Sequence, residues 1–99
     1  MARELKFDPD FKNDTKDAAL YYEDQKPGLG GEFLIALSDG IKRLTETPLR
    51  WRPIRGKYRR CNVKKFPYVI IFSVTEKEIY IAALMHKRRH PDFWLDRIE

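Results

Sequence analysis

The chain has 99 residues and a formal net charge of +5, and its 42% of apolar residues cluster in blocks, which excludes a disordered chain. The longest apolar block, residues 68–74, is far shorter than the roughly 20 residues that a membrane-spanning helix needs, and residues 1–6 carry charges where a secretory signal is apolar. The length suits one domain over residues 1–99, and the single Cys61 excludes an internal disulfide, which favours a reducing, cytoplasmic setting.

The first part of the chain predicts a short strand and then a helix. Residues 3–7 alternate weakly between polar and apolar side chains and end at Pro9, as an edge strand does. Asp14 or Thr15 is a suitable helix cap, and we expect that helix to run to about Asp24. The next segment, Lys-Pro-Gly-Leu-Gly-Gly, cannot continue a helix without a large cost, so the helix ends there.

A second helix is expected from Glu32 to about Thr45, because apolar residues recur there with the 3.6-residue period. Its expected buried face consists of Phe33, Ala36, Leu37, Gly40, Ile41 and Leu44. We expect Gly40 to let the first helix come close, with Ala18 and Ala19 as the matching small surface. The two helices then form an antiparallel hairpin.

The second half of the chain predicts a loop and three strands. Residues 48–56 are rich in Pro and Gly and are expected to form the loop, and the strands are expected at residues 58–63, 66–74 and 78–85. A short segment from Pro91 follows them. The fold class is therefore α+β, in the order βααβββ, with a helical hairpin packed on a small, mostly antiparallel sheet.

Charge is distributed unevenly along the chain. Residues 1–49 have a net charge of −3, whereas residues 50–99 have +8, and the stretch from Arg50 to Lys65 has no acid at all. A second basic run covers residues 87–89, between two histidines. This asymmetry indicates an acidic partner, either nucleic acid or an acidic protein, or a solvated basic face. A membrane surface fits least, because no amphipathic helix carries these charges.

Strand periodicity assigns side chains to the two faces of the sheet. If Cys61 and Val63 face the helices, Arg60 and Lys64 face away from them. In the last strand both alternating sets are apolar, so the pattern does not choose between the faces. The antiparallel order also predicts that residues 86–89 approach the basic run near the start of the preceding strand.

Several short motifs together carry a family resemblance. In the helical half they are Tyr21-Tyr22-Glu23, Pro27-Gly28-Leu29-Gly30, Phe33-Leu34 and Pro48, and in the strand half they are Arg59-Arg60, Phe66-Pro67-Tyr68, His86 to Pro91 and Trp94. In their order and spacing they resemble the RelE/ParE superfamily of bacterial toxins, and ParE-like members most closely. The resemblance implies the toxin of a type II toxin–antitoxin module, on a βααβββ fold, with a cognate antitoxin as partner.

The superfamily has two activities, and one position helps to choose between them. Members that cleave messenger RNA on the ribosome resemble one another in carrying an arginine after the tyrosine that enters the central strand, and here Val69 follows Tyr68. Near the C-terminus, where those members carry a tyrosine or histidine, this chain has Phe93 and Trp94. The resemblance therefore favours the branch that poisons DNA gyrase over the RNA-cleaving branch.

Two alternatives stay open at this point. A ribosome-dependent endoribonuclease would need an acid–base group and cations at the phosphate, and the candidates are His86 or His90 with Arg60, Arg88 and Lys57. Equally, these histidines are ordinary residues beside a basic run. The other alternative is a basic binding module without toxicity.

The expected partners and binding residues follow from the charge pattern and the resemblance. We expect the target, either DNA gyrase or the ribosome with its mRNA, to contact Arg59, Arg60, Lys64, His86, Lys87, Arg88, Arg89 and Trp94. The antitoxin is expected to cover apolar surface around the helical hairpin and to place acids near the basic run. We expect no cofactor, no metal site and no membrane partner, and we expect Cys61 to face the core rather than act as a nucleophile.

Overall fold

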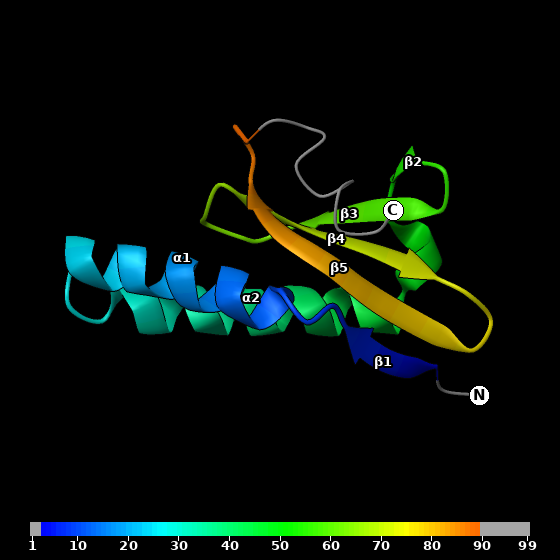
Figure 1. Ribbon diagram of the computed structural model, residues 1–99, viewed down its shortest axis with the longest axis horizontal. Helices are drawn as coiled ribbons and strands as arrows, with labels where there is room; N and C mark the ends of the chain where they lie inside the picture. Colours follow the sequence, from blue (N-terminus) through cyan, green and yellow to red (C-terminus); the bar gives the residue numbers. More distant parts are fainter. Residues whose placement is uncertain (1–2, 90–99) are drawn as a thin grey trace.

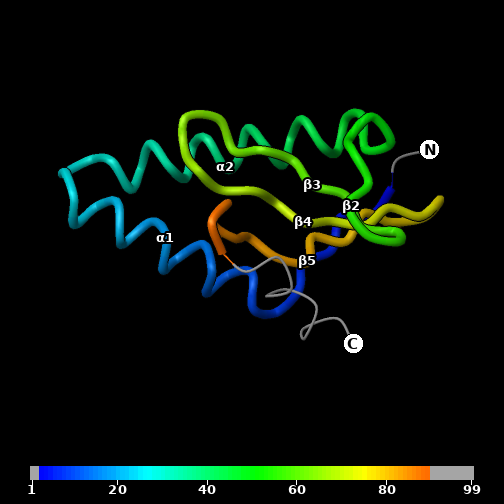
Figure 2. The backbone as a smooth tube through the Cα atoms, turned by 90° about the horizontal axis from the view of Figure 1, so that it is seen from above, coloured from blue at the N-terminus to red at the C-terminus, as the bar shows by residue number. Residues whose placement is uncertain are grey.

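Two antiparallel helices lie on one face of a five-stranded sheet in the computed structural model, which describes residues 3–89 (Figure 1). The elements are β1 (Glu4–Phe7), α1 (Phe11–Gln25), α2 (Leu29–Glu46), the short 3-10 helix η1 (Pro48–Arg50), β2 (Pro53–Arg55), β3 (Tyr58–Asn62), β4 (Tyr68–Val74) and β5 (Glu78–His86). Seen from above, the hairpin of α1 and α2 extends past the strands (Figure 2). The predicted α+β class is confirmed, and so is the order βααβββ apart from one additional strand, β2.

The sheet has one more strand than the sequence predicts. Its order is β1-β5-β4-β3-β2, with β1 parallel to β5 and every other pair antiparallel. The assignment of residues 48–56 to a loop was wrong, because this segment contains η1 and the edge strand β2. Pro53 has no N–H to donate, so it is compatible with an edge strand, which is where the structure places it.

Helix α1 begins earlier than predicted, and neither Asp14 nor Thr15 caps it. The Thr15 hydroxyl donates to the Phe11 carbonyl at 2.9 Å, and a carboxylate oxygen of Asp14 accepts from the Leu84 N–H at 3.4 Å. Phe11 is buried and its ring lies 5.5 Å from that of Phe7. Burial of Phe11 therefore makes α1 begin at Phe11, before Asp14 and Thr15, whose side chains are better suited to capping a helix.

The turn of the hairpin explains the Pro-Gly-Leu-Gly motif. Gly28 has φ +89°, which L side chains rarely adopt. The carboxylate of Glu23 accepts from the N–H of Gly28 at 3.0 Å and from the N–H of Gly30 at 3.0 Å, so it satisfies free donors at the start of α2. The motif is thus a helix connection held by one acidic side chain.

The close approach of the two helices occurs at Gly30, so the expectation placed on Gly40 was wrong. A Cβ built on Gly30 would lie 2.6 Å from the backbone oxygen of Ala19, whereas one on Gly40 would lie 3.1 Å from Cδ1 of Ile70 in the sheet. Gly40 therefore adjoins β4, and Ala19 belongs to the contact with Gly30.

Replacing Gly30 by alanine is expected to lower the free energy of unfolding by about 2 kcal/mol, because backbone atoms must move to admit the methyl group. The matched control is Gly31→Ala, since a Cβ on Gly31 meets nothing within 4 Å. For a domain of this size the loss corresponds to a melting temperature about 10 °C lower. Equal melting temperatures for the two variants would contradict the close approach.

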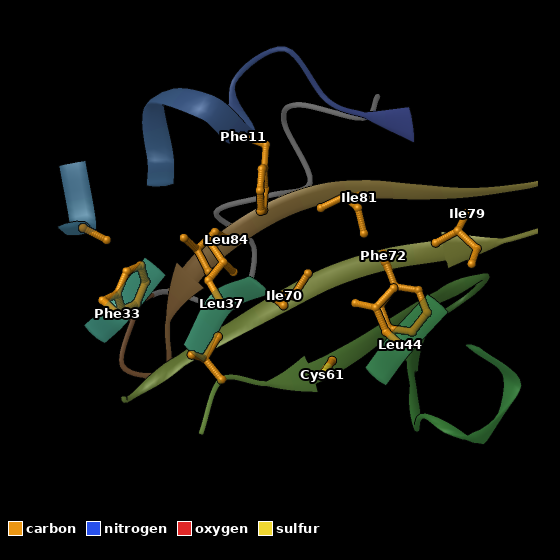
Figure 3. Close-up of a cluster of buried hydrophobic side chains, with 12 residues drawn as sticks. Phe11, Phe33, Leu37, Leu44, Cys61, Ile70, Phe72, Ile79, Ile81 and Leu84 are labelled. Carbon is orange, nitrogen blue, oxygen red and sulfur yellow. The ribbon is translucent and has the colours of Figure 1, made fainter. Parts of the chain in front are cut away.

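The main core lies between the helices and the sheet (Figure 3). Its fully buried side chains include Phe33, Leu44, Cys61, Ile70, Phe72 and Ile81. A second apolar cluster on the other face of the sheet contains Val69, Ile71, Ala82, Ala83 and Met85. Because both faces are buried, strands β4 and β5 consist of nearly continuous apolar residues.

A bulge explains why periodicity could not assign the faces of β5. Ile71 pairs with Ala83 and the next residue, Phe72, pairs with Ile81, so Ala82 is an extra residue in β5. The alternation therefore shifts by one position there. Ile81 and Leu84 both belong to the main core although they are three residues apart.

A partly buried side-chain hydrogen bond joins the β1–α1 connection to the sheet. The Tyr80 hydroxyl donates to Oδ2 of Asp8 at 2.8 Å, and Oδ1 of Asp8 accepts from the Asp10 N–H at 3.0 Å. Desolvation and the contact with the Asp8 carboxylate raise the pKa of Tyr80 to about 12. The neutral phenol is thus the form that the fold stabilises.

The stability of the fold is therefore expected to fall as Tyr80 ionises. Its folded-state pKa lies above the ordinary value of 10.0, so the contribution is complete below pH 10 and is lost as the pH rises towards 12. Urea unfolding between pH 9 and about 12 is expected to show this loss in the wild type and a smaller loss in Tyr80→Phe. An identical pH dependence for the two proteins would contradict the assignment.

No helix within residues 3–89 is both long enough and apolar enough to cross a membrane.

Candidate functional site

The basic residues at one end of the sheet form a single surface. His86 pairs with Tyr68, and the Lys87 N–H donates to the Pro67 carbonyl at 2.8 Å, so the chain after β5 lies against the β3–β4 turn (Figure 1). This confirms that residues 86–89 approach the basic run. We call the resulting surface the cationic end, and it consists of the exposed residues Lys64, Lys65, Lys87, Arg88 and Arg89.

The β3–β4 turn at the cationic end has an unusual backbone. Lys65 has φ 72°, in the left-handed region that lysine rarely adopts. The Val63 N–H donates to the Tyr68 carbonyl at 2.9 Å and closes the turn. Glycine would adopt this conformation without steric cost, so the backbone of Lys65 is strained relative to glycine.

His86 is tied to the chain reversal that follows it. Its Nδ1 accepts from the Arg88 N–H at 3.0 Å, and its ring lies 5.3 Å from the ring of Tyr68. Nδ1 is then the unprotonated nitrogen, and Nε2 carries the proton of the neutral ring. A general base must present an unprotonated nitrogen to its substrate, and in His86 that nitrogen already accepts a backbone hydrogen bond.

The four residues considered for RNA cleavage do not converge. Arg60 pairs with Ile71 and shares the face of the second apolar cluster, whereas His86 pairs with Tyr68, whose ring packs on the helix side. Lys57 precedes β3 near Ser73, five residues and about 17 Å along β4 from Tyr68. Only Arg88 lies next to His86. The structure therefore separates Arg60 and Lys57 from the histidine.

The side chain of Arg59 forms hydrogen bonds to the backbone of a neighbouring segment. Its guanidinium donates to the carbonyl of Trp51 at 2.7 Å and to the carbonyl of Leu49 at 3.3 Å. It pairs with Phe72 and so points to the helix side of the sheet. Arg59 thus holds the segment after η1 in place.

Two other candidates, His90 and Trp94, lie outside the described residues.

Val69 stands where the RNA-cleaving members resemble one another in carrying an arginine. It is only 2% exposed, pairs with Asn62 and Met85, and belongs to the second apolar cluster. A buried valine cannot stabilise charge on a phosphate. The position of that arginine therefore holds no cation in this chain.

Cys61 lies in the core, as expected. Its Sγ is 3.7 Å from the Gly40 carbonyl, and burial raises the pKa of the thiol. A buried thiol with a raised pKa provides little thiolate for nucleophilic attack.

An apolar groove lies beside α2, where the sequence predicts apolar surface around the helical hairpin, although the residues that line it were not predicted. It has a volume of about 630 Å³, and Tyr22, Leu29, Ile35, Ala36, Phe66 and Pro67 form its apolar lining. Glu32 and Asp39 also line it, as do Lys64 and Lys65 from the β3–β4 turn. We call this site the hairpin groove. Its one sequence signal is Ile35, which is 73% exposed and widens the apolar stripe of α2 beyond the core-facing positions.

Comparison with known proteins gives a family match over most of the chain. Residues 5–91 match the family model described as ParE toxin of type II toxin–antitoxin system, parDE. Toxin ParE2 of Mycobacterium tuberculosis strain H37Rv is 26% identical over 93 residues, which are 93% of this chain and 89% of the relative. The Toxin ParE2 of strain CDC 1551 / Oshkosh matches to the same extent.

Solved structures share the fold. The chromosomal ParDE TA system from P. aeruginosa contains a chain with a TM-score of 0.76 and 19% identity, covering 85% of this chain and 95% of that one. The E. coli DinJ–YafQ toxin–antitoxin complex contains a chain with a TM-score of 0.61 and 17% identity, covering 87% and 93%. Both similarities extend over the helical hairpin and the sheet together.

Proposed function

The chain belongs to the ParE toxin family of type II toxin–antitoxin systems, and on that premise we propose that it arrests bacterial growth by acting on DNA gyrase rather than by cutting RNA. The observation that carries this choice is the buried Val69 in place of an arginine. The separation of Arg60 from His86 across the sheet supports it. In this proposal the protein works in the cytoplasm and needs no cofactor.

The cationic end is the surface that we assign to the target. Its residues come from two segments that are far apart in the sequence, and all five of them are basic. Such a surface steers an acidic partner towards the protein and fixes its orientation. An acidic region of the gyrase complex is the partner that this charge fits.

The hairpin groove is the surface that we assign to the cognate antitoxin. Its floor is apolar, with Glu32 and Asp39 contributed by α2 and Lys64 and Lys65 by the β3–β4 turn. An amphipathic segment fits this arrangement when its apolar side chains enter the groove, its acids face the lysines and its bases face α2. Such a segment would also cover Lys64, which belongs to the cationic end, so antitoxin and target would compete.

Induction of the protein in a growing bacterium tests the choice of target, with total RNA and plasmid topology measured together. We expect growth arrest with intact mRNA and with relaxed plasmid or trapped gyrase breaks, and we expect co-expression of the antitoxin to restore growth. Cuts in mRNA that disappear in His86→Ala would contradict the proposal and establish a nuclease. Normal growth with abundant folded protein would contradict toxicity itself.

A further inference from the structure

Three hydrogen bonds hold the chain reversal that presents Lys87, Arg88 and Arg89 at the cationic end. The Lys87 N–H donates to the Pro67 carbonyl at 2.8 Å, and the Arg89 N–H donates to the His86 carbonyl at 3.0 Å. The Arg88 N–H donates to Nδ1 of His86, also at 3.0 Å. The three basic residues are exposed, so burial contributes little to the position of this segment and the hydrogen bonds determine it.

One of these three acceptors changes with pH. The two carbonyl oxygens accept a hydrogen bond at any pH, whereas Nδ1 accepts one only while the imidazole is neutral. Histidine is the side chain that ordinarily gains a proton between pH 5 and 8, and both of its ring nitrogens are then donors. A protonated Nδ1 would direct its hydrogen at the Arg88 N–H, 3.0 Å away, so the observed reversal is compatible only with the neutral ring.

The surroundings of His86 contain other partners for a protonated ring. His86 lines a cavity of about 220 Å³ between α1 and the end of β5. The other charged or titratable residues that line it are Asp14, Asp17 and Tyr21 from α1, Tyr68 from β4 and Arg89 after β5, whereas Lys64 and Lys65 of the β3–β4 turn do not. The two carboxylates attract an imidazolium and Arg89 repels it. Both effects favour a charged ring that lies nearer to α1 and away from the segment after β5.

We propose that the cationic end is pH-sensitive, because neutral His86 holds residues 87–89 in the observed reversal and protonation of His86 releases them. His86 acts through the backbone N–H of Arg88 and is therefore a positioning residue for the basic side chains. As the pH falls, the cationic end keeps its charge and loses its fixed arrangement, so a partner must order three side chains on binding. The consequence for gyrase rests on the proposed function, whereas the release itself does not.

Nitrogen-15 NMR of the full chain between pH 5 and 8 tests the release. Every protein carries His90→Gln, so that His86 is the one histidine that titrates. We expect Nδ1 to be the unprotonated nitrogen of the neutral ring, and we expect the Arg88 amide shift to follow the titration of His86 with the same midpoint. Loss of the hydrogen bond is expected to lower the protection of the Arg88 N–H against hydrogen exchange about fivefold.

Two substitutions of His86 are the matched controls. In His86→Asn the side-chain oxygen accepts from the N–H two residues further on, as in an Asx turn, so high protection of the Arg88 N–H is expected at every pH. In His86→Ala that acceptor is missing, so low protection is expected at every pH. Titration of His86 without a change at the Arg88 amide, a proton on Nδ1 of the neutral ring, or a wild-type response in His86→Asn would each overturn the proposal.

Gyrase binding tests the consequence separately. The ratio of wild-type to His86→Asn affinity, with both proteins at the same pH, is expected to fall about fivefold from pH 8 to pH 5.5. A constant ratio beside the expected NMR response would overturn the link between the fixed reversal and target binding. Absence of gyrase binding at every pH would overturn the proposed function, and the NMR measurement would still decide whether protonation releases the segment.

Discussion

Replacing Lys87 and Arg88 together by glutamate is expected to abolish growth arrest while leaving the fold intact. Both side chains are exposed at the cationic end, and no side-chain hydrogen bond or ion pair within residues 3–89 depends on them. Like charges placed against each other across an interface cost several kcal/mol, so affinity for an acidic target is expected to fall by a factor of about 100 or more. Plating efficiency after induction measures the effect.

The matched control carries the same change in net charge elsewhere. Lys12 and Lys16 are exposed on α1, and replacing both by glutamate also changes the charge by −4. This control is expected to arrest growth like the wild type, and both variants are expected to melt at the wild-type temperature. Full toxicity of the folded Lys87→Glu, Arg88→Glu protein would contradict the assignment of the cationic end to the target.

Replacing Ile35 by glutamate is expected to abolish neutralisation by the antitoxin without reducing toxicity. Ile35 is 73% exposed, so the fold gains little from it, and it lines the hairpin groove together with Glu32 and Asp39. A third carboxylate buried there against an apolar segment would cost several kcal/mol. Affinity for the product of the adjacent gene, measured by calorimetry, is expected to fall by a factor of about 100 or more.

Leu49→Glu is the control for this effect. Leu49 is 62% exposed in η1 and does not line the hairpin groove, so the same change in polarity should leave antitoxin binding unaltered. The groove would be excluded as the antitoxin site if Ile35→Glu bound the antitoxin with wild-type affinity, or if both variants lost it equally.

The order of elements could be predicted from the sequence because local patterns determine it. The 3.6-residue period of α2 indicates a helix, and the apolar runs of β4 and β5 indicate buried strands. The errors occurred where tertiary contacts override local preference. Burial of Phe11 starts α1 before its best capping residues, and pairing with β3 makes a strand of the Pro-rich segment from Pro53 to Arg55.

The surfaces could be predicted only in part. Antiparallel pairing was enough to bring residues 86–89 to the basic run, and strand parity was enough to place Arg60 on the face away from the helices. The same parity was wrong for Lys64, which lies beyond the end of β3 and lines the groove beside α2. The use of the Arg59 guanidinium to hold the Trp51 carbonyl depends on where η1 ends, which no periodicity shows. The role of Glu23 at the start of α2 likewise depends on the geometry of the hairpin turn.

The central claim is that this toxin acts on gyrase, and purified components test it most directly. Gyrase, ATP and relaxed plasmid are combined with the wild-type chain, the Lys87→Glu, Arg88→Glu variant or the Lys12→Glu, Lys16→Glu control. The account predicts that the wild type and the control block supercoiling or trap cleaved plasmid, and that the cationic-end variant does neither. Undiminished supercoiling with the wild type, together with cleavage of mRNA on purified translating ribosomes, would contradict it.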